Sequence, residues 1–294
     1  MWFEQIKRGT GGDDEHILFC FPYAAGNAEV FVPFSHYVNS NTSVYAMQLP
    51  GNGRRFSEAL CNDVCKILDE VEREATSLMS GKQYSFLGHS NGGLFAFELA
   101  SRFIAQDKPP ARIFIAAEAP PHITDFKHDP MHSDDDEMAE VLRRYGGTQP
   151  DILDDVDFRS LFFPIIRNEL SINFHMKRAL KEKTINYPLV LIHGSCDSTV
   201  SKTDMAAWAR YTSAHIGLHT VSSDHFFINH QPKEVADIVN QQLAKSAGRG
   251  VGAQPPLTQW RHHTTGATVS SRLAKRRCSP EAITSSVRSD LTAA

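Results

Sequence analysis

Short apolar runs and longer amphipathic stretches alternate along most of the chain. The runs predict strands at residues 17–21, 43–47, 84–87, 113–117, 189–193 and 218–221. Several are apolar at nearly every position, which is typical of strands covered on both faces of a parallel sheet. Helices are expected between them at residues 64–79 and 94–104, and a last helix at 234–243 closes the domain. This alternation predicts an α/β fold with a mostly parallel, doubly wound sheet.

Residues 121–183 interrupt the alternation, because no strand is predicted there. One helix is expected to start at Ser133 and to end before the glycines at 146–147, with acidic residues in its first turn and basic residues in its last. A second, strongly apolar helix is expected at 158–181, where Pro164 either kinks it or marks its first turns. Such an insertion is either additional core or a lid over a pocket.

The acidic cluster at 134–136, with His128 and His132 nearby, has a competing interpretation as a metal site. Acidic side chains are also favoured in the first turn of a helix, because they interact with the positive end of the helix dipole. The helix start explains the cluster without a metal. We favour that interpretation and expect no metal.

The composition excludes several classes of protein. The 294 residues are 41% hydrophobic and 22% charged, which rules out wholesale disorder. No apolar run approaches the ~18 residues that a membrane-spanning helix needs, and the first residues lack the pattern of a secretion signal. The five cysteines are odd in number and lack CxxC spacing, so we expect free thiols and a cytoplasmic location.

Residues 247–294 differ from the rest of the chain. They carry a net charge of +5, which leaves −9 for residues 1–246, and Trp260 is their single aromatic residue. So little apolar surface cannot offset the entropy of ordering, and we expect a disordered basic tail after one folded domain. The alternative is a nucleic-acid or membrane tether built on the basic run at 272–277. We disfavour it, because charge runs are usually only solvated, and expect neither partner.

Candidate chemistry lies at residues 88–92, where Gly-His-Ser-Asn-Gly fits the pattern G-x-S-x-G. The pattern alone is weak, since a chain of this length contains it by chance about 0.1 times. Its place directly after a predicted strand and directly before a predicted helix is what a nucleophile elbow requires. We therefore predict that Ser90 is a catalytic nucleophile rather than part of an ordinary turn.

A serine hydroxyl needs a base to remove its proton, and the base needs an acceptor to orient it. In folds with this elbow, the acid and then the histidine follow the serine along the chain. Asp197 lies just after a predicted strand, 107 residues beyond Ser90, and His225 follows 28 residues later. Both have rivals. Asp224 adjoins the histidine and cannot easily turn to meet its ring, and His89 is held on the opposite side of the elbow.

Acyl transfer also needs an oxyanion hole, in which backbone N–H groups point at the developing negative oxygen. One donor is expected from Asn91, the residue after the nucleophile. The other is expected from the loop at 21–26, where we favour the amide of Ala24 over that of Tyr23. The small residues of this loop also fit a simple turn, but its place at the carboxyl end of a strand favours function.

Five motifs follow one another along the chain. They are FPYAAG at 21–26, QLPG at 48–51 with Arg54 and Arg55, GHSNGG at 88–93, YGGT at 145–148 and DHFF at 224–227. In this order they resemble the motifs of the type II thioesterases of polyketide and nonribosomal peptide synthesis. The resemblance spans about residues 16–243. It implies an α/β-hydrolase fold with a helical lid at 121–183, a triad of Ser90, Asp197 and His225, and no cofactor.

The chain departs from the family pattern at several positions. Tyr23 and Ala25 stand where the family usually has His and Gly, Asn91 replaces Met, Gly93 replaces Ala, and Ser198 replaces a common proline. These departures touch the oxyanion loop and the pocket floor. They bear on the acyl preference more than on the mechanism.

The resemblance also implies a partner. The family removes stalled or misprimed acyl groups from the phosphopantetheine arm of carrier proteins, which typically present an acidic face. The core charge of −9 gives no global attraction to such a face, so docking needs local basic groups. The candidates are Arg54, Arg55, Lys177, Arg178, Lys181 and Lys183. We expect a monomer.

The residues by themselves identify only a serine hydrolase, because the triad serves thioesters and oxygen esters alike. A chain-releasing thioesterase, an esterase or a lactonase on the same fold is therefore the alternative to an editing thioesterase. A non-catalytic protein that only binds carriers is disfavoured, because all three residues of the expected triad are present.

Overall fold

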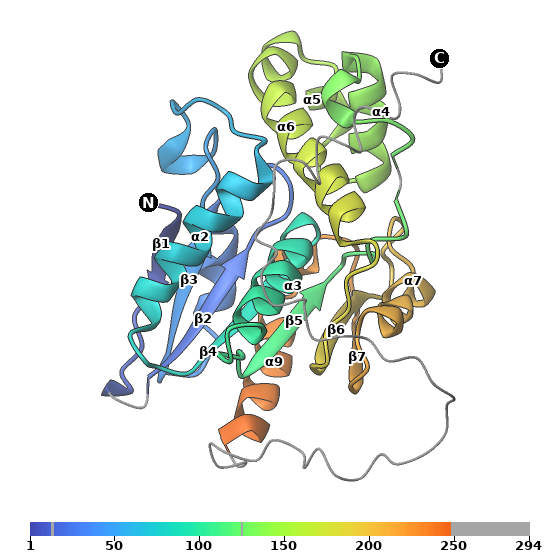
Figure 1. Cartoon of the computed structure of the whole chain (residues 1–294). Coiled ribbons are helices and arrows are strands. Elements are labelled where there is room, and N and C mark those ends of the chain that lie inside the picture. The colour runs from blue at the N-terminus through green and yellow to red at the C-terminus, as the bar shows by residue number, and fades with distance from the viewer. Residues whose placement is uncertain (13–14, 125, 248–294) are drawn as a thin grey trace.

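A seven-stranded sheet forms the centre of the computed structural model, which describes residues 1–12, 15–124 and 126–247 (Figure 1). Its strands are β1 (Phe3–Lys7), β2 (His16–Phe21), β3 (Thr42–Met47), β4 (Tyr84–His89), β5 (Arg112–Ala116), β6 (Leu189–Gly194) and β7 (Ile216–Val221). They lie in the order β1-β3-β2-β4-β5-β6-β7, and all neighbours are parallel except β1 and β3. The predicted basic tail lies outside the described residues from position 248 onward.

The six predicted strands and the mostly parallel sheet are confirmed, whereas β1 was not predicted. Its sequence, FEQIK, has apolar residues only at Phe3 and Ile6, and only Phe3 is buried. The strand lies at the edge of the sheet and pairs antiparallel with β3. An edge strand with one buried residue leaves no clear hydrophobic pattern in the sequence.

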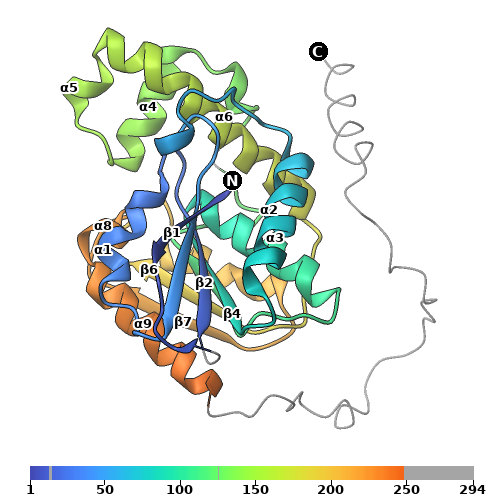
Figure 2. The same cartoon turned by 90° about the vertical axis from the view of Figure 1, so that its left-hand side faces the viewer.

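Helices cover both faces of the sheet. The α-helices of the described residues are α1 (Val32–Ser35), α2 (Val64–Met79), α3 (Asn91–Ile104), α4 (Asp135–Tyr145), α5 (Pro150–Leu153), α6 (Val156–Leu180), α7 (Lys202–Ala206), α8 (Phe227–His230) and α9 (Pro232–Ala247). Helices α2 and α3 pack on one face and α1, α8 and α9 on the other (Figure 2). Side chains of β2 alternate between the two cores, with Phe19 in one and Leu18 in the other. Such alternation is what a strand buried on both faces requires.

Helices α4, α5 and α6 lie together beyond the carboxyl ends of the strands, at the top of Figure 1. They have a small apolar core of their own, which includes Met138, Leu153 and Phe163. The long helix α6 continues through Pro164 and descends onto α3, so the segment is both a separate layer and part of the main core. Helix α5 was not predicted, because its four residues are too few for a periodic pattern.

Helices α4, α5 and α6 make up the segment predicted as a lid, and the acidic cluster at the start of α4 makes its contacts within this segment. Asp134 caps the helix by accepting hydrogen bonds from the backbone N–H groups of residues 136 and 137. Asp135 pairs with Arg167 and Asp136 pairs with Arg159, both on α6. The carboxylates therefore start one helix and tie it to another, as the helix-start interpretation expects.

Within the described residues, no helix has the length and apolar character needed to cross a bilayer.

Candidate active site

Ser90 occupies the sharp turn between β4 and α3. Its backbone angles, φ 51° and ψ −127°, are unfavourable for a residue with a side chain. The Ser90 N–H donates to the carbonyl of Ala116 on the neighbouring strand at 2.7 Å. The surrounding structure thus fixes the strained turn and presents the hydroxyl at the carboxyl edge of the sheet.

Two glycines allow this turn to form. A Cβ atom on Gly88 would lie 2.0 Å from the carbonyl oxygen of Gly92. A Cβ atom on Gly92 would lie 2.0 Å from the carbonyl oxygen of Phe21 on β2. Both distances are far inside van der Waals contact, so any side chain at either position would push the helix away from the sheet. The G-x-S-x-G spacing is therefore a packing requirement of the elbow.

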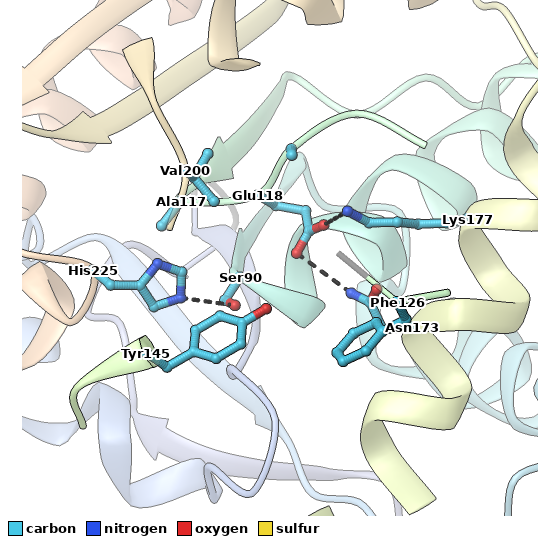
Figure 3. A pocket seen from close by; sticks show the side chains of 10 residues that line it. Ser90, Ala117, Glu118, Phe126, Tyr145, Asn173, Lys177, Val200 and His225 are labelled. Carbon is cyan, nitrogen blue, oxygen red and sulfur yellow. Dashed lines mark hydrogen bonds and ion pairs between the residues drawn. The ribbon is translucent and has the colours of Figure 1, made fainter. Parts of the chain in front are cut away.

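His225 and Asp197 meet Ser90 at this edge of the sheet. The Nε2 atom of His225 lies 3.0 Å from Ser90 Oγ, and its Nδ1 atom lies 2.8 Å from an oxygen of Asp197. Figure 3 shows the contact between His225 and Ser90. The three residues follow β4, β6 and β7, whose parallel strands end at the same edge. The structure thus brings together the three residues selected from the sequence.

Asp197 is held as an ionised acceptor. Its Oδ1 atom accepts hydrogen bonds from the backbone N–H groups of Thr199 and Val200 and from the Thr199 hydroxyl, at 2.8–3.0 Å. Burial by itself raises the pKa of a carboxyl, but the hydrogen bonds and the neighbouring His225 outweigh it and lower the pKa of Asp197 to about 2. The Thr199 hydroxyl also lies 3.0 Å from His225 Nδ1 and was not identified from the sequence.

The rival residues have other partners. Asp224 accepts hydrogen bonds from the backbone N–H of Phe226 and from the ring of His230. His89 is fully buried, and its Nε2 atom lies 2.8 Å from the backbone carbonyl of His225. Burial and the neighbouring His225 lower the pKa of His89 to about 3, so its ring is neutral and donates to this carbonyl. His89 therefore supports the backbone of His225.

The loop after β2 is attached to α6. The Ala25 N–H donates to the Glu169 carboxylate at 2.7 Å, and the side chain of Asn52 donates to the other oxygen of the same carboxylate. The side chain of Asn91 donates to the backbone carbonyl of Glu169 at 3.1 Å. One residue of the lid helix thus connects the expected oxyanion loop, the loop after β3 and the elbow. The backbone amides of Ala24 and Asn91 remain the predicted oxyanion donors.

Glu169 is a buried carboxyl whose charge is disfavoured by its surroundings. Burial raises its pKa to about 7, although the hydrogen bonds from Ala25 and Asn52 act in the opposite direction. The sequence contains a signal for this residue. Glu169, Asn173 and Lys177 recur every four residues within the predicted helix, which places them on one face.

A pocket opens beside Ser90 and His225. Its walls include Glu118, Asn173 and Lys177 as well as the apolar or aromatic residues Ala117, Ala119, Phe126, Tyr145 and Val200. Lys177 is 8% exposed, pairs with Glu118 at 2.8 Å and donates to the carbonyl of Ile123. Its expected place on an exposed docking surface is therefore wrong, because the helical period turns it towards the pocket.

The other candidate docking residues lie elsewhere. Arg54 is exposed and pairs with Glu4, and Arg178 is exposed with its guanidinium over the ring of Phe174. The Arg55 side chain is only 13% exposed, because it pairs with Glu58 and lies over Trp2. No surface common to these three residues follows from their contacts.

The fold and the site define the class of protein, an α/β-hydrolase with a serine in the nucleophile elbow. A family model described as "Thioesterase domain" matches residues 16–243, and the chain belongs to that family. It is 30% identical over 230 residues to the gramicidin S biosynthesis protein GrsT of Aneurinibacillus migulanus, covering 77% of this chain and 88% of that protein. It is also 30% identical over 230 residues to thioesterase TesA of Mycobacterium marinum, covering 75% and 88%.

Solved structures agree on the fold. YbtT, a type II thioesterase from the yersiniabactin NRPS/PKS pathway, superposes with a TM-score of 0.73 at 20% identity, over 84% of this chain and 99% of that one. ClbQ, from the colibactin NRPS/PKS pathway, superposes with a TM-score of 0.69 at 24% identity, over 79% and 98%. The expected α/β-hydrolase fold is confirmed.

Proposed function

We propose that the protein is an editing type II thioesterase. It hydrolyses acyl thioesters on the phosphopantetheine arm of carrier proteins in polyketide or nonribosomal peptide synthesis. The observation that carries the proposal is the continuous hydrogen-bond chain from Ser90 through His225 to Asp197, in a chain of the thioesterase family. The names of the relatives, which include a gramicidin S biosynthesis protein and a type II thioesterase, support the pathway.

The reaction follows from the order of the three residues. His225 takes the proton of Ser90 as the serine oxygen attacks the acyl carbon, and ionised Asp197 stabilises the imidazolium that forms. His225 then gives this proton to the sulfur, the thiol of the carrier arm leaves, and an acyl-serine remains. His225 then activates a water molecule, which releases the acid and regenerates Ser90. No step requires a cofactor, because a thiol with an ordinary pKa of ~8.5 is already a good leaving group.

The negative oxygen of each tetrahedral intermediate requires donors that are already in place. We assign this role to the backbone N–H groups of Asn91 and Ala24. The bond from the Ala25 N–H to Glu169 supports the assignment, because it fixes the loop next to Ala24 without using the Ala24 amide. Each such donor is worth roughly 2.7–4 kcal/mol of the barrier.

Carrier proteins are the proposed partners of a monomeric, cytoplasmic enzyme. We assign docking to exposed basic side chains. Arg54 and Arg178 are exposed, whereas the Arg55 side chain is only 13% exposed and is expected to contribute less. Reversing both charges (Arg54→Glu with Arg178→Glu) should lower kcat/KM for a carrier-bound thioester about tenfold through slower association. A short soluble thioester should be hydrolysed at the unchanged rate. Equal losses on both substrates would contradict this docking assignment.

Intact-mass measurement tests the proposed function directly. Carriers loaded with several acyl groups are incubated with the wild-type protein or with Ser90→Ala, and the masses of the carriers are followed over time. We expect the wild type to return the carriers to their free-thiol mass and the variant to leave them loaded. Hydrolysis of matched oxygen esters but not of the carriers would instead indicate an esterase or a lactonase.

A further inference from the structure

Three polar side chains, Glu118, Asn173 and Lys177, form one side of the pocket, and we call them the polar wall. Lys177 Nζ lies 2.8 Å from one oxygen of the Glu118 carboxylate, and the Asn173 amide lies 3.5 Å from the other. Each of the three residues is at most 8% exposed. In Figure 3, the polar wall lies on one side of Ser90 and His225 lies on the other. It therefore faces the space where the acyl group of a substrate on Ser90 must lie.

The backbone is arranged to direct Glu118 into this space. Ala117, which directly follows β5, has a φ of 51°, an unfavourable value for a residue with a Cβ atom. Its N–H donates to the carbonyl of Ile192 at 3.0 Å, and the Trp208 indole donates to the carbonyl of Glu118 at 2.7 Å. A strained residue held by bonds on both sides is typical of a position with a functional constraint.

Gly93 leaves room for the same side chain. A Cβ atom built on Gly93 would lie 2.9 Å from Cβ and 3.3 Å from Cγ of Glu118. Atoms of this kind do not approach so closely, so a side chain at position 93 would displace Glu118. The first turn of α3, which positions the nucleophile, is thus also shaped to accept a charged residue in the pocket.

A buried charge pair beside an acyl site is unfavourable for a purely apolar substrate. A bound alkyl chain would take water away from the pair and return no hydrogen bond, which costs free energy. A carboxylate accepts about four hydrogen bonds, and Glu118 therefore has the capacity for a further donor besides Lys177 and Asn173. A positively charged substrate group would be repelled by Lys177, and a negatively charged one would be repelled by Glu118. A neutral hydroxyl, which donates and accepts, suits both.

We propose that the polar wall makes this enzyme selective for acyl groups that carry a hydroxyl on the chain, a specificity that rests on the proposed thioesterase function. The hydroxyl donates to the Glu118 carboxylate, and Lys177 and Asn173 keep that carboxylate in place. A hydrogen bond to a charged group is expected to favour the hydroxyacyl substrate by about 10- to 150-fold in kcat/KM.

The test compares two carrier-bound substrates that differ by one oxygen, 3-hydroxybutyryl and butyryl. The ratio of their kcat/KM values cancels any change that affects the nucleophile equally for both. For the wild type we expect a ratio of about 10 or more in favour of the hydroxyacyl group. A ratio near one would overturn the inference while the hydrolysis of both substrates upheld the proposed function. If neither carrier loses its acyl group, the proposed function itself fails, and this inference fails with it.

Variants assign the selectivity to the polar wall. In Glu118→Leu with Lys177→Met both charges are removed together, so that neither remains buried alone, and we expect the ratio to fall to about one. Gly93→Ala keeps both charges but displaces Glu118, and we expect the ratio to fall at least about threefold. If the double variant does not fold, the ratio measured for Gly93→Ala tests the assignment. Lys82→Met is the control, since Lys82 pairs with Glu15 and neither residue lines this pocket. A wild-type ratio in both test variants would overturn the assignment.

Discussion

The two sides of the pocket are built in different ways. On one side, Ser90, Asp197 and His225 follow parallel strands and are positioned by backbone hydrogen bonds and by close contact at glycines. On the other side, Asn173 and Lys177 reach across from α6 to meet Glu118. The first arrangement is fixed by the sheet, and the second depends on how one lid helix packs. The comparison indicates that the reaction and the choice of substrate can change independently.

We call the side of the pocket that carries Ser90, Asp197 and His225 the strand side. The largest effect on activity is expected there. Ser90→Ala removes the atom that attacks the substrate, so kcat for a carrier-bound thioester should fall by about 10⁶-fold, to the level left by substrate positioning alone. Stopped incubations analysed by mass give the rate. A fall of less than about 100-fold would show that the strand side does not carry the reaction.

Asp197→Asn should lower kcat by about 10⁴-fold with little change in KM, because an asparagine amide can hold the His225 ring in the wrong tautomer. Asp224→Asn is the matched control. It makes the same chemical change one residue away from His225, but its carboxylate contacts Phe226 N–H and His230 instead. We expect less than about a threefold loss for the control, since it is outside the hydrogen-bond chain. Similar losses in the two variants would contradict the assignment of the acid.

Gly92→Ala tests whether the strand side depends on close backbone contact. The added Cβ atom would lie 2.0 Å from the carbonyl oxygen of Phe21, so the free energy of unfolding should fall by about 3 kcal/mol or more. Gly146→Ala is the control, because a Cβ atom there meets nothing within 4 Å, although φ is 79°. It should cost only about 1 kcal/mol. Urea unfolding measures both, and equal losses would show that the contact at Gly92 is relaxed easily.

The smallest effect concerns Glu169, which joins the lid helix to the strand side. Its pKa is about 7 in the folded protein, against an ordinary value of 4.5, so between these pH values the folded state binds more protons than the unfolded state. Stability therefore falls as pH rises through this window, by at most about 3 kcal/mol. The loss of stability that Glu169 causes is complete above about pH 7. Protonation of Asp197 destabilises the fold in a separate window, below pH 4.

Glu169→Gln separates this contribution from all others, because the amide keeps the shape but does not titrate. The free energy of unfolding is measured from pH 4.5 to 8 for both proteins. The wild-type value minus the variant value should decline with pH and level off above about pH 7. A constant difference would show that Glu169 does not titrate in this range.

The sequence allowed prediction of the strand side but not of the polar wall. Six strands and the three residues at their ends follow from apolar runs, from one turn motif and from the order of residues in the chain. Glu118 has no local signal, because its direction depends on the backbone at Ala117 and on the space left at Gly93. Lys177 was assigned to the surface, since a charged residue in a helix is usually exposed; its burial follows from how α6 packs on α3.

The most direct test of the central claim is whether Ser90 is the activated nucleophile. The protein is treated with a fluorophosphonate, and its peptides are analysed by mass spectrometry while thioester hydrolysis is followed in parallel. We predict a single adduct on the peptide that contains Ser90, a matching loss of activity, and no adduct in Ser90→Ala. Full hydrolysis by a protein that carries the adduct, or an adduct on another residue with loss of activity, would contradict the account.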